Sequence, residues 1–144
     1  MSLDALHQAI YGERKVSQGT LKTEMSQLRD TLTGLLGSRP YRLLMPIDGD
    51  FLRVEQSLNA GYLEAAIKLY TGIFFSKTES PFLCTWRTCL EARLSQAIYH
   101  SDQVDLLLMH LSNCPDASDA IERLIELMPD NLSIHQHLEV LSNR

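Results

Sequence analysis

The sequence predicts a mainly α-helical protein with one small β-hairpin near its front. Apolar residues recur at helical spacing along most of the 144 residues, whereas alternation with period two is confined to residues 35–44. Hydrophobic residues make up 44% and charged residues 22% of the chain, which is typical of a globular protein and excludes a disordered one. Glycine and proline together number only 12, too few for a turn-rich β-sandwich or barrel.

Two helices are expected in the first part of the chain. Residues 3–11 form a short amphipathic pattern, and residues 21–32 form a longer one with a single apolar stripe. Ser17 and Thr20 are both candidate N-caps for the second helix, since their hydroxyls can accept from backbone N–H groups of its first turn. The stripe of the second helix consists of Leu21, Met25, Leu28 and Leu32.

A hairpin and a boundary follow. Residues 35–44 place apolar residues on both sides of a Gly-Ser-Arg-Pro turn, the pattern of two short strands. Pro46 and Asp48-Gly49 then break the pattern. The sequence therefore predicts two domains, residues 1–45 and residues 46–144.

The second domain is expected to contain six helices arranged in pairs. Two helices of about eleven residues joined at Gly61 form an αα-hairpin. The pairs resemble tetratricopeptide stacking, so the expected fold is a tetratricopeptide-like bundle of antiparallel helix pairs, although the full 34-residue pattern is not met. The apolar run 73–75, the pair Phe82 and Trp86, and Cys84 and Cys89 are expected to be buried. The expected helix N-caps are Asp48 or Asp50, Ser80, Asp102, Asp116, and Asn131 or Ser133.

Charge is distributed unevenly along the chain, whose net charge is −5. Residues 1–45 carry six basic and four acidic groups, whereas residues 46–144 carry seven basic and fourteen acidic groups. Only the first domain is therefore suited to approach a polyanion. The alternative is that the basic residues are ordinary solvated surface.

Several segments resemble one family of regulators. Residues 20–29, TLKTEMSQLR, are similar to the recognition helix of the response-regulator type of winged helix, and residues 38–43 resemble its wing, which closes with Tyr-Arg-Leu. Residues 3–12 resemble the middle helix of that domain. Residues 50–72 resemble a bacterial transcriptional activator domain, and residues 76–90 resemble a stretch of certain GAF-containing transcriptional regulators.

The resemblance implies a truncated winged helix. The opening sheet and first helix of that domain are absent before residue 3, so the chain is expected to be the C-terminal part of a longer bacterial regulator. Its expected partners are double-stranded DNA and the other domains of that parent protein. The truncation is also expected to leave Leu6, Ile10 or Leu21 exposed, as an apolar surface that a second copy covers in a homodimer.

The expected DNA surface combines the polar side of the second helix with the hairpin. Ser26 and Gln27 are suited to major-groove base edges, and Thr23 to a thymine methyl or a phosphate. Arg39 at the hairpin tip suits a narrow minor groove. Asp30 argues against this surface because its carboxylate repels phosphate. The expected phosphate contacts are Lys22, Arg29 and Arg42.

Other functions are expected to be absent or secondary. His110 and Cys114 lie four residues apart but have no third ligand nearby, so no metal is expected. The sequence shows no glycine-rich phosphate loop, nucleophile elbow or Ser/His/Asp arrangement, so no cofactor and no catalysis are expected. The longest uninterrupted apolar run, residues 106–109, is far shorter than a membrane span, and no signal-peptide pattern opens the sequence, so a cytoplasmic location is expected. The alternative function is a helical-repeat module that binds a protein through its acidic body, without DNA.

Overall fold

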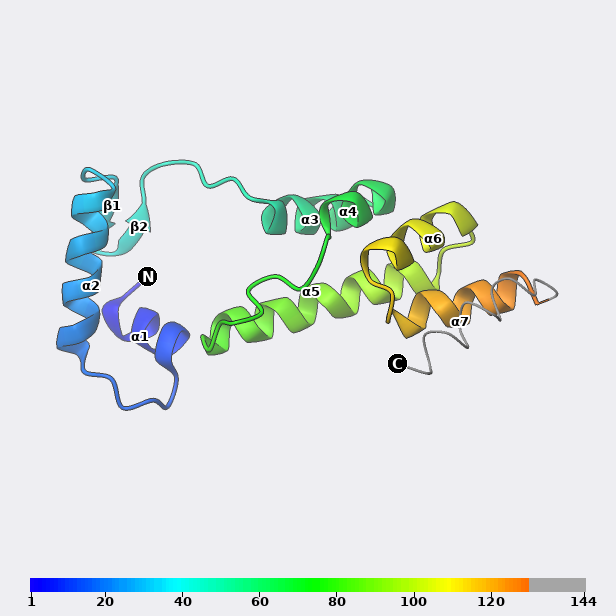
Figure 1. Cartoon of the computed structure of the whole chain (residues 1–144). Coiled ribbons are helices and arrows are strands. Elements are labelled where there is room, and N and C mark those ends of the chain that lie inside the picture. Colours follow the sequence, from blue (N-terminus) through cyan, green and yellow to red (C-terminus); the bar gives the residue numbers. More distant parts are fainter. Residues whose placement is uncertain (130–144) are drawn as a thin grey trace. The chain divides into compact units, whose positions relative to one another are not determined.

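The computed structural model describes residues 1–129 (Figure 1). Within these residues the chain forms seven α-helices and one two-stranded antiparallel hairpin, which confirms the mainly helical fold class. It divides into two compact units: the first comprises Met1–Ile47 with Phe75–Arg87, and the second comprises Asp48–Phe74 with the described residues from Thr88 onward. The helix expected after Asn131 or Ser133 lies outside the described residues.

The first unit contains two helices, the hairpin and the beginning of a third helix. Both complete helices start with a serine N-cap: the Ser2 hydroxyl accepts from the N–H of Ala5 at 3.2 Å, and the Ser17 hydroxyl from the N–H of Thr20 at 3.1 Å. Ser17, not Thr20, is therefore the N-cap of the second helix. The elements are α1 (Leu3–Tyr11), α2 (Gln18–Thr31), β1 (Leu36–Ser38), β2 (Tyr41–Leu43) and the start of α5 (Pro81–Tyr99).

The core of the first unit is small. Leu21, Met25 and Leu36 are buried, and half-buried side chains from α1, α2 and β2 pack around them. Figure 1 shows α1 and the hairpin on the same side of α2, where this core lies. Leu28 is 42% exposed, so the predicted apolar stripe of α2 is only partly buried. The half-buried partners are Leu3, Leu6, Ile10, Tyr11, Leu32 and Tyr41.

This core changes the expectation about exposed apolar residues. Leu21 is fully buried, so the prediction that it is left exposed is wrong, and Leu6 and Ile10 are half-buried. The reason is that the hairpin supplies Leu36 and Tyr41 on the side where the truncated domain was expected to lack cover. The homodimer stays a prediction that these three residues do not support.

Segment 75–87 belongs to the first unit although it follows the first half of the second unit in sequence. The Ser80 hydroxyl donates to the backbone carbonyl of Ala9 at 2.7 Å, and Arg14 forms an ion pair with Glu79 at 2.5 Å. Pro81 also lies so close to Gly12 that a Cβ there would come within 2.8 Å of its ring, and Gly12 has a φ of +59°. The first unit thus extends beyond the segment 1–45 expected from the sequence.

The described part of the second unit is built from four helices and the rest of α5. The predicted αα-hairpin is present, since α3 and α4 pack on each other, and α6 packs on both α4 and α7. Val54, Ile67, Leu90, Leu107 and Leu124 are fully buried between these helices. The tetratricopeptide-like arrangement stays a prediction. The four helices are α3 (Asp50–Asn59), α4 (Leu63–Leu69), α6 (Val104–Asn113) and α7 (Ser118–Leu127).

The predicted aspartate caps of the second unit are wrong. Gly49, Gln103 and Ala117 occupy the N-cap positions of α3, α6 and α7, and none makes a side-chain cap. Two of the predicted aspartates are instead bound to arginines, Asp48 to Arg53 and Asp102 to Arg123. A charged guanidinium is a stronger partner for a carboxylate than a helix N–H group, which explains these two exchanges. We have no such explanation for Asp50 and Asp116.

The Ser80 cap is confirmed, because its hydroxyl accepts from the N–H of Leu83 at 3.3 Å.

Several apolar side chains are less buried than expected. Ile73 is 63% exposed, and Phe75, Phe82 and Cys89 are also exposed. Ile73 and Phe75 lie on the connection between α4 and α5, where helical periodicity gives no information about the inward side, whereas Phe82 and Cys89 lie on the exposed side of α5 itself. Within residues 1–129, no helix combines the length and the apolar character needed to cross a bilayer.

Candidate nucleic-acid interface

The side of α2 opposite its core stripe is exposed and polar. Lys22, Thr23, Ser26 and Gln27 are all exposed, while Leu21 on the other side is buried. The two sides differ because a helix makes one turn every 3.6 residues. This repeat places positions 21 and 25 on one face of α2 and positions 22, 23, 26 and 27 on another. The structure therefore presents these four side chains together on one helix face, as expected.

Two of the expected site residues are already engaged within the unit. The Thr23 hydroxyl donates to the carbonyl of Gly19 at 3.1 Å, so its methyl group is the part left for an outside contact. Arg29 is half-buried, and its Nε donates to the carbonyl of Leu36 at 3.3 Å. This bond ties the end of α2 to β1. Arg29 thus fixes the position of the hairpin relative to the helix.

The hairpin carries two further cations. Arg39 is exposed in the turn between the strands, and Arg42 on β2 pairs with Gly37 on β1. Because side chains alternate along a strand, Arg42 lies on the hairpin face opposite to Leu36 and Tyr41, which join the core. A Cβ at Gly37 would come within 3.2 Å of the Arg42 Cγ, so the glycine leaves room for the arginine stem to cross the hairpin.

Met1, two residues before α1, forms backbone hydrogen bonds to β2, which the sequence did not indicate. The Tyr41 N–H donates to the Met1 carbonyl at 2.9 Å, and the Met1 amino group donates to the Tyr41 carbonyl at 2.9 Å. No local pattern predicts such a pairing, because it joins residues 40 positions apart. The contact holds the start of the chain against the outer edge of β2.

The acidic side chains of α2 fall into two classes. Glu24 accepts a hydrogen bond from the Tyr11 hydroxyl at 2.5 Å, and this bond raises the pKa of Tyr11 above its ordinary value. The Glu24 carboxylate is therefore turned toward α1. Asp30 is exposed, one turn beyond Ser26 and Gln27, and opposes an approaching phosphate.

The charge balance of the first unit is positive. It contains eight basic and five acidic residues. Lys22, Arg39 and Arg42 form no ion pair among the described residues, so their charges are not cancelled by a neighbouring carboxylate. These three side chains are available to an anionic partner.

Residues 1–129 hold no group of three or more His, Cys, Asp or Glu side chains arranged to bind a metal ion. The site is therefore built from hydrogen-bonding and cationic side chains.

Comparison with known proteins finds a distant relative of this chain. The chain is 28% identical over 110 residues to an uncharacterized 47.3 kDa protein in the thcA 5' region of Rhodococcus erythropolis. The match covers 76% of this chain but only 25% of that protein, so the chain spans about a quarter of the relative's length. No family model matches the sequence. No solved structure matches it either.

Proposed function

We propose that the first unit binds double-stranded DNA and that the chain forms part of a transcriptional regulator. The support is the combination of one polar helix face, a hairpin with two uncancelled arginines, and a positive charge balance. The resemblance of residues 20–29 and 38–43 to a recognition helix and a wing supports the same role. The proposal assigns binding to these residues, and no catalysis.

Each side chain has a distinct role in this proposal. Ser26 and Gln27 read base edges in the major groove, because their hydroxyl and amide groups both donate and accept hydrogen bonds. Lys22 binds a backbone phosphate at the start of the same face. Thr23 contributes its methyl group to a thymine methyl, since its hydroxyl is bound to Gly19.

The hairpin arginines act beside the helix. Arg39 enters the minor groove, where a narrow groove concentrates negative potential. Arg42 binds the backbone next to it. Arg29 holds the hairpin in place through Leu36 and offers the rest of its guanidinium to a phosphate at the junction.

The observation that carries the proposal is the exposure of Lys22, Ser26 and Gln27 on a helix whose opposite side builds the core. A surface helix needs only one buried stripe, and its outer face is usually covered with mixed charges. Here Thr23, Ser26 and Gln27 place uncharged hydrogen-bonding groups in the middle of the outer face, between Lys22 and Asp30, and this arrangement suits base reading.

A binding experiment tests the proposal. Fluorescence anisotropy with a labelled random duplex at low salt should give saturable binding to the 144-residue chain in the range of about 10⁻⁶–10⁻⁴ M that is typical of non-specific binding. Charge reversal by Arg39→Glu should weaken it by about tenfold or more. The matched control is Lys77→Glu, which changes the same charge in the same unit but lies outside α2 and the hairpin. Absence of binding, or equal effects of both variants, would contradict the proposal.

A second candidate function rests on the second unit. Its described residues carry eleven acidic and four basic groups, so it suits a basic or amphipathic protein partner. One candidate for this partner is another domain of the proposed parent regulator. A pull-down experiment separates the two functions. This second function is favoured over the first if the chain does not bind DNA but does capture a protein partner, and if Lys22→Glu and Arg39→Glu leave that capture unchanged.

A further inference from the structure

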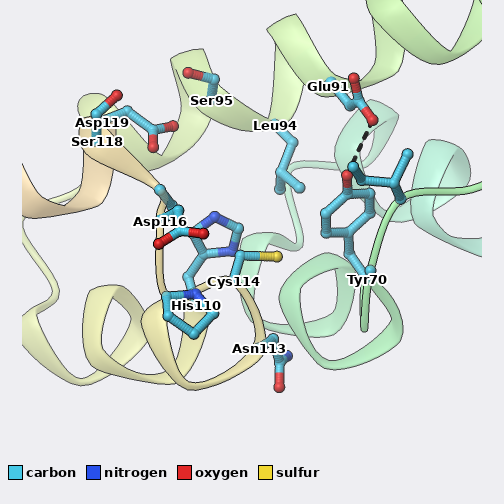
Figure 2. A pocket seen from close by; sticks show the side chains of 14 residues that line it. Tyr70, Glu91, Leu94, Ser95, His110, Asn113, Cys114, Asp116, Ser118 and Asp119 are labelled. Atoms are coloured by element: carbon cyan, nitrogen blue, oxygen red, sulfur yellow. Dashed lines mark hydrogen bonds between the residues drawn. The ribbon is translucent and has the colours of Figure 1, made fainter. Parts of the chain in front are cut away.

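The second unit contains a cavity that the DNA-binding proposal does not use. It has a volume of about 570 Å³ and lies where the end of α4, the middle of α5, the end of α6 and the loop before α7 meet. Figure 2 shows the side chains that line it. This volume falls in the range of small-molecule sites, about 300–1,000 Å³.

A buried histidine faces this cavity without a partner. His110 is 4% exposed, and its Nδ1 has no hydrogen-bond partner among the described residues. Figure 2 places its ring among Cys114, Asp116 and Leu94. Burial lowers the pKa of His110, and only Asp119 opposes this shift, so the ring is neutral near pH 7. Leaving a buried polar atom unsatisfied costs about 1–3 kcal/mol, so such atoms in native proteins usually have a partner.

Three carboxylates surround the same space. Glu91, Asp116 and Asp119 line the cavity, and none of the lysines and arginines within residues 1–129 does. Burial, followed by the negative charges of Asp119 and Glu91, raises the pKa of the Cys114 thiol. The cavity is therefore a region of concentrated negative charge.

These carboxylates form no ion pair with any basic residue in the described part of the unit. Every lysine and arginine of its described part is used in an ion pair elsewhere, and none of those pairs includes a cavity carboxylate. The negative charge of the cavity thus remains available to an outside cation. The four basic residues are Arg53, Lys68, Arg93 and Arg123.

The rest of the lining combines the polar residues Ser95, Asn113 and Ser118 with apolar and aromatic side chains. The Tyr70 hydroxyl donates to the Glu91 carboxylate at 3.2 Å, which orients this carboxylate beside the aromatic ring. The Tyr70 and His110 rings lie 6.5 Å apart, and Leu94 is buried beside them. An aromatic face next to a carboxylate is suited to a protonated amine with a short hydrocarbon part.

The chemistry of the lining narrows the ligand class. An anion is disfavoured because three carboxylates and no cation line the space. A metal ion is disfavoured because the described residues offer no group of three His, Cys, Asp or Glu ligands. A protonated organic amine satisfies the carboxylates and donates to an imidazole nitrogen at once.

We propose that this cavity binds a small organic diamine, with one ammonium group at Glu91 and the other at Asp119, an N–H donated to His110, and its hydrocarbon part against Tyr70 and Leu94. The proposal does not depend on DNA binding by the first unit. It assigns the second unit the role of a small-molecule binding domain.

Calorimetric titration of the whole chain at physiological salt tests this assignment. The probe is 1,5-diaminopentane, compared with pentane-1,5-diol and glutarate, which have the same length but are neutral and anionic. The diamine should bind with one-to-one stoichiometry and a Kd of about 1 mM or lower, a free energy of about −4 kcal/mol or better. Equal binding of the diol, or no saturable binding of the diamine, would overturn the proposal.

Matched carboxylate variants localise the binding. Asp119→Asn should weaken the diamine by about tenfold, because it removes the charge from one of the two proposed ammonium sites. Asp105→Asn makes the same charge change on α6 outside the cavity and should alter the Kd by less than about twofold. Equal losses in the two variants would mean that the amine is attracted only by the net negative charge of the unit, which would overturn the site.

The variant His110→Leu separates binding from folding. It replaces an unpartnered buried polar ring by an apolar side chain, so the midpoint of urea unfolding should stay the same or rise. Diamine affinity should nevertheless fall about fivefold or more, since the acceptor is lost. Unchanged affinity would overturn the role of His110. A parallel loss of stability and binding would mean that the histidine is structural, which would also overturn it.

Discussion

The two units use their charged side chains in different ways. In the second unit all four described basic residues form ion pairs with carboxylates. Its described acidic residues outnumber the basic ones by seven. In the first unit the balance is reversed, and Lys22, Arg39 and Arg42 form no ion pair among the described residues. One chain thus presents a cationic surface on one unit and an anionic cavity on the other. The comparison teaches that the net charge of −5 describes neither unit.

The units also differ in how their helices and cores are stabilised. In the first unit α1 and α2 have serine caps, and only three side chains are buried in a small core. In the second unit α3, α6 and α7 lack side-chain caps, but several fully buried side chains hold them together. We infer that the first unit depends more on local bonds and the second more on apolar packing. The predictions below test this difference and the charge difference.

The largest effect is expected from truncating the core of the second unit. Leu107 is fully buried, so Leu107→Ala should lower the free energy of unfolding by about 2–5 kcal/mol. The next residue along α6, Leu108, is 48% exposed, and Leu108→Ala should cost well under about 1 kcal/mol. Urea unfolding followed by circular dichroism measures both. Similar losses in the two variants would contradict the burial of α6.

A smaller effect is expected from the cap of α2. Ser17→Ala removes the acceptor for the Thr20 N–H and should destabilise the first unit by about 1 kcal/mol. Asp102, which the sequence predicts as the cap of α6, makes no cap, so Asp102→Ala should not increase hydrogen exchange in the first turn of α6. Hydrogen exchange of the two first turns measures the contrast. If Asp102→Ala increased exchange at the start of α6 while Ser17→Ala left α2 unchanged, the inferred difference between the two units would be wrong.

The buried histidine makes the stability of the second unit depend on pH. The pKa of His110 lies below its ordinary value of 6.5 because burial disfavours the charged ring. As the pH falls below about 6.5, the unfolded chain takes up a proton before the folded chain does, so stability is full above that pH and decreases toward the folded-state pKa. His110→Leu should flatten this decrease, whereas His100→Leu, at an exposed site, serves as the control. If His110→Leu left the dependence of the unfolding free energy on pH unchanged, the account of His110 as a buried neutral ring would be wrong.

The smallest effect is expected from the two acidic residues of α2. Asp30→Asn removes an exposed carboxylate from the proposed DNA face and should tighten DNA binding a few-fold at low salt. Glu24→Gln removes the same charge, but Tyr11 holds this side chain toward α1, so the gain should be smaller. Anisotropy titrations compare the two. A larger gain from Glu24→Gln would place the DNA on the other side of the helix.

Local patterns predicted most of the elements. The helix over 3–11, the two helices joined at Gly61 and the hairpin over 35–44 follow from the period of their apolar residues and from their turn residues, and the structure confirms them. The exposed face of α2 follows from the same period, because burial of Leu21 and Met25 fixes the direction of Lys22 and Ser26.

Contacts distant in sequence could not be predicted. The aspartate caps fail because Arg53 and Arg123 attract Asp48 and Asp102, and only one of those arginines lies near its partner in sequence. The inclusion of residues 75–87 in the first unit depends on the bond from Ser80 to Ala9.

The cavity shows the same limit. The spacing of His110 and Cys114 is visible in the sequence, but nothing local indicates that Tyr70 and Glu91 line the same space.

The salt dependence of DNA binding tests the central claim most directly. If α2 and the hairpin bind phosphates, the logarithm of the binding constant should fall linearly with the logarithm of salt concentration, with a slope of about −0.9 for each phosphate neutralised. Lys22→Ala should make this slope less negative by about 1, and Lys77→Ala, an exposed lysine of the same unit outside the proposed face, should leave it unchanged. A slope near zero in the unmodified chain, or the same change in both variants, would contradict the account.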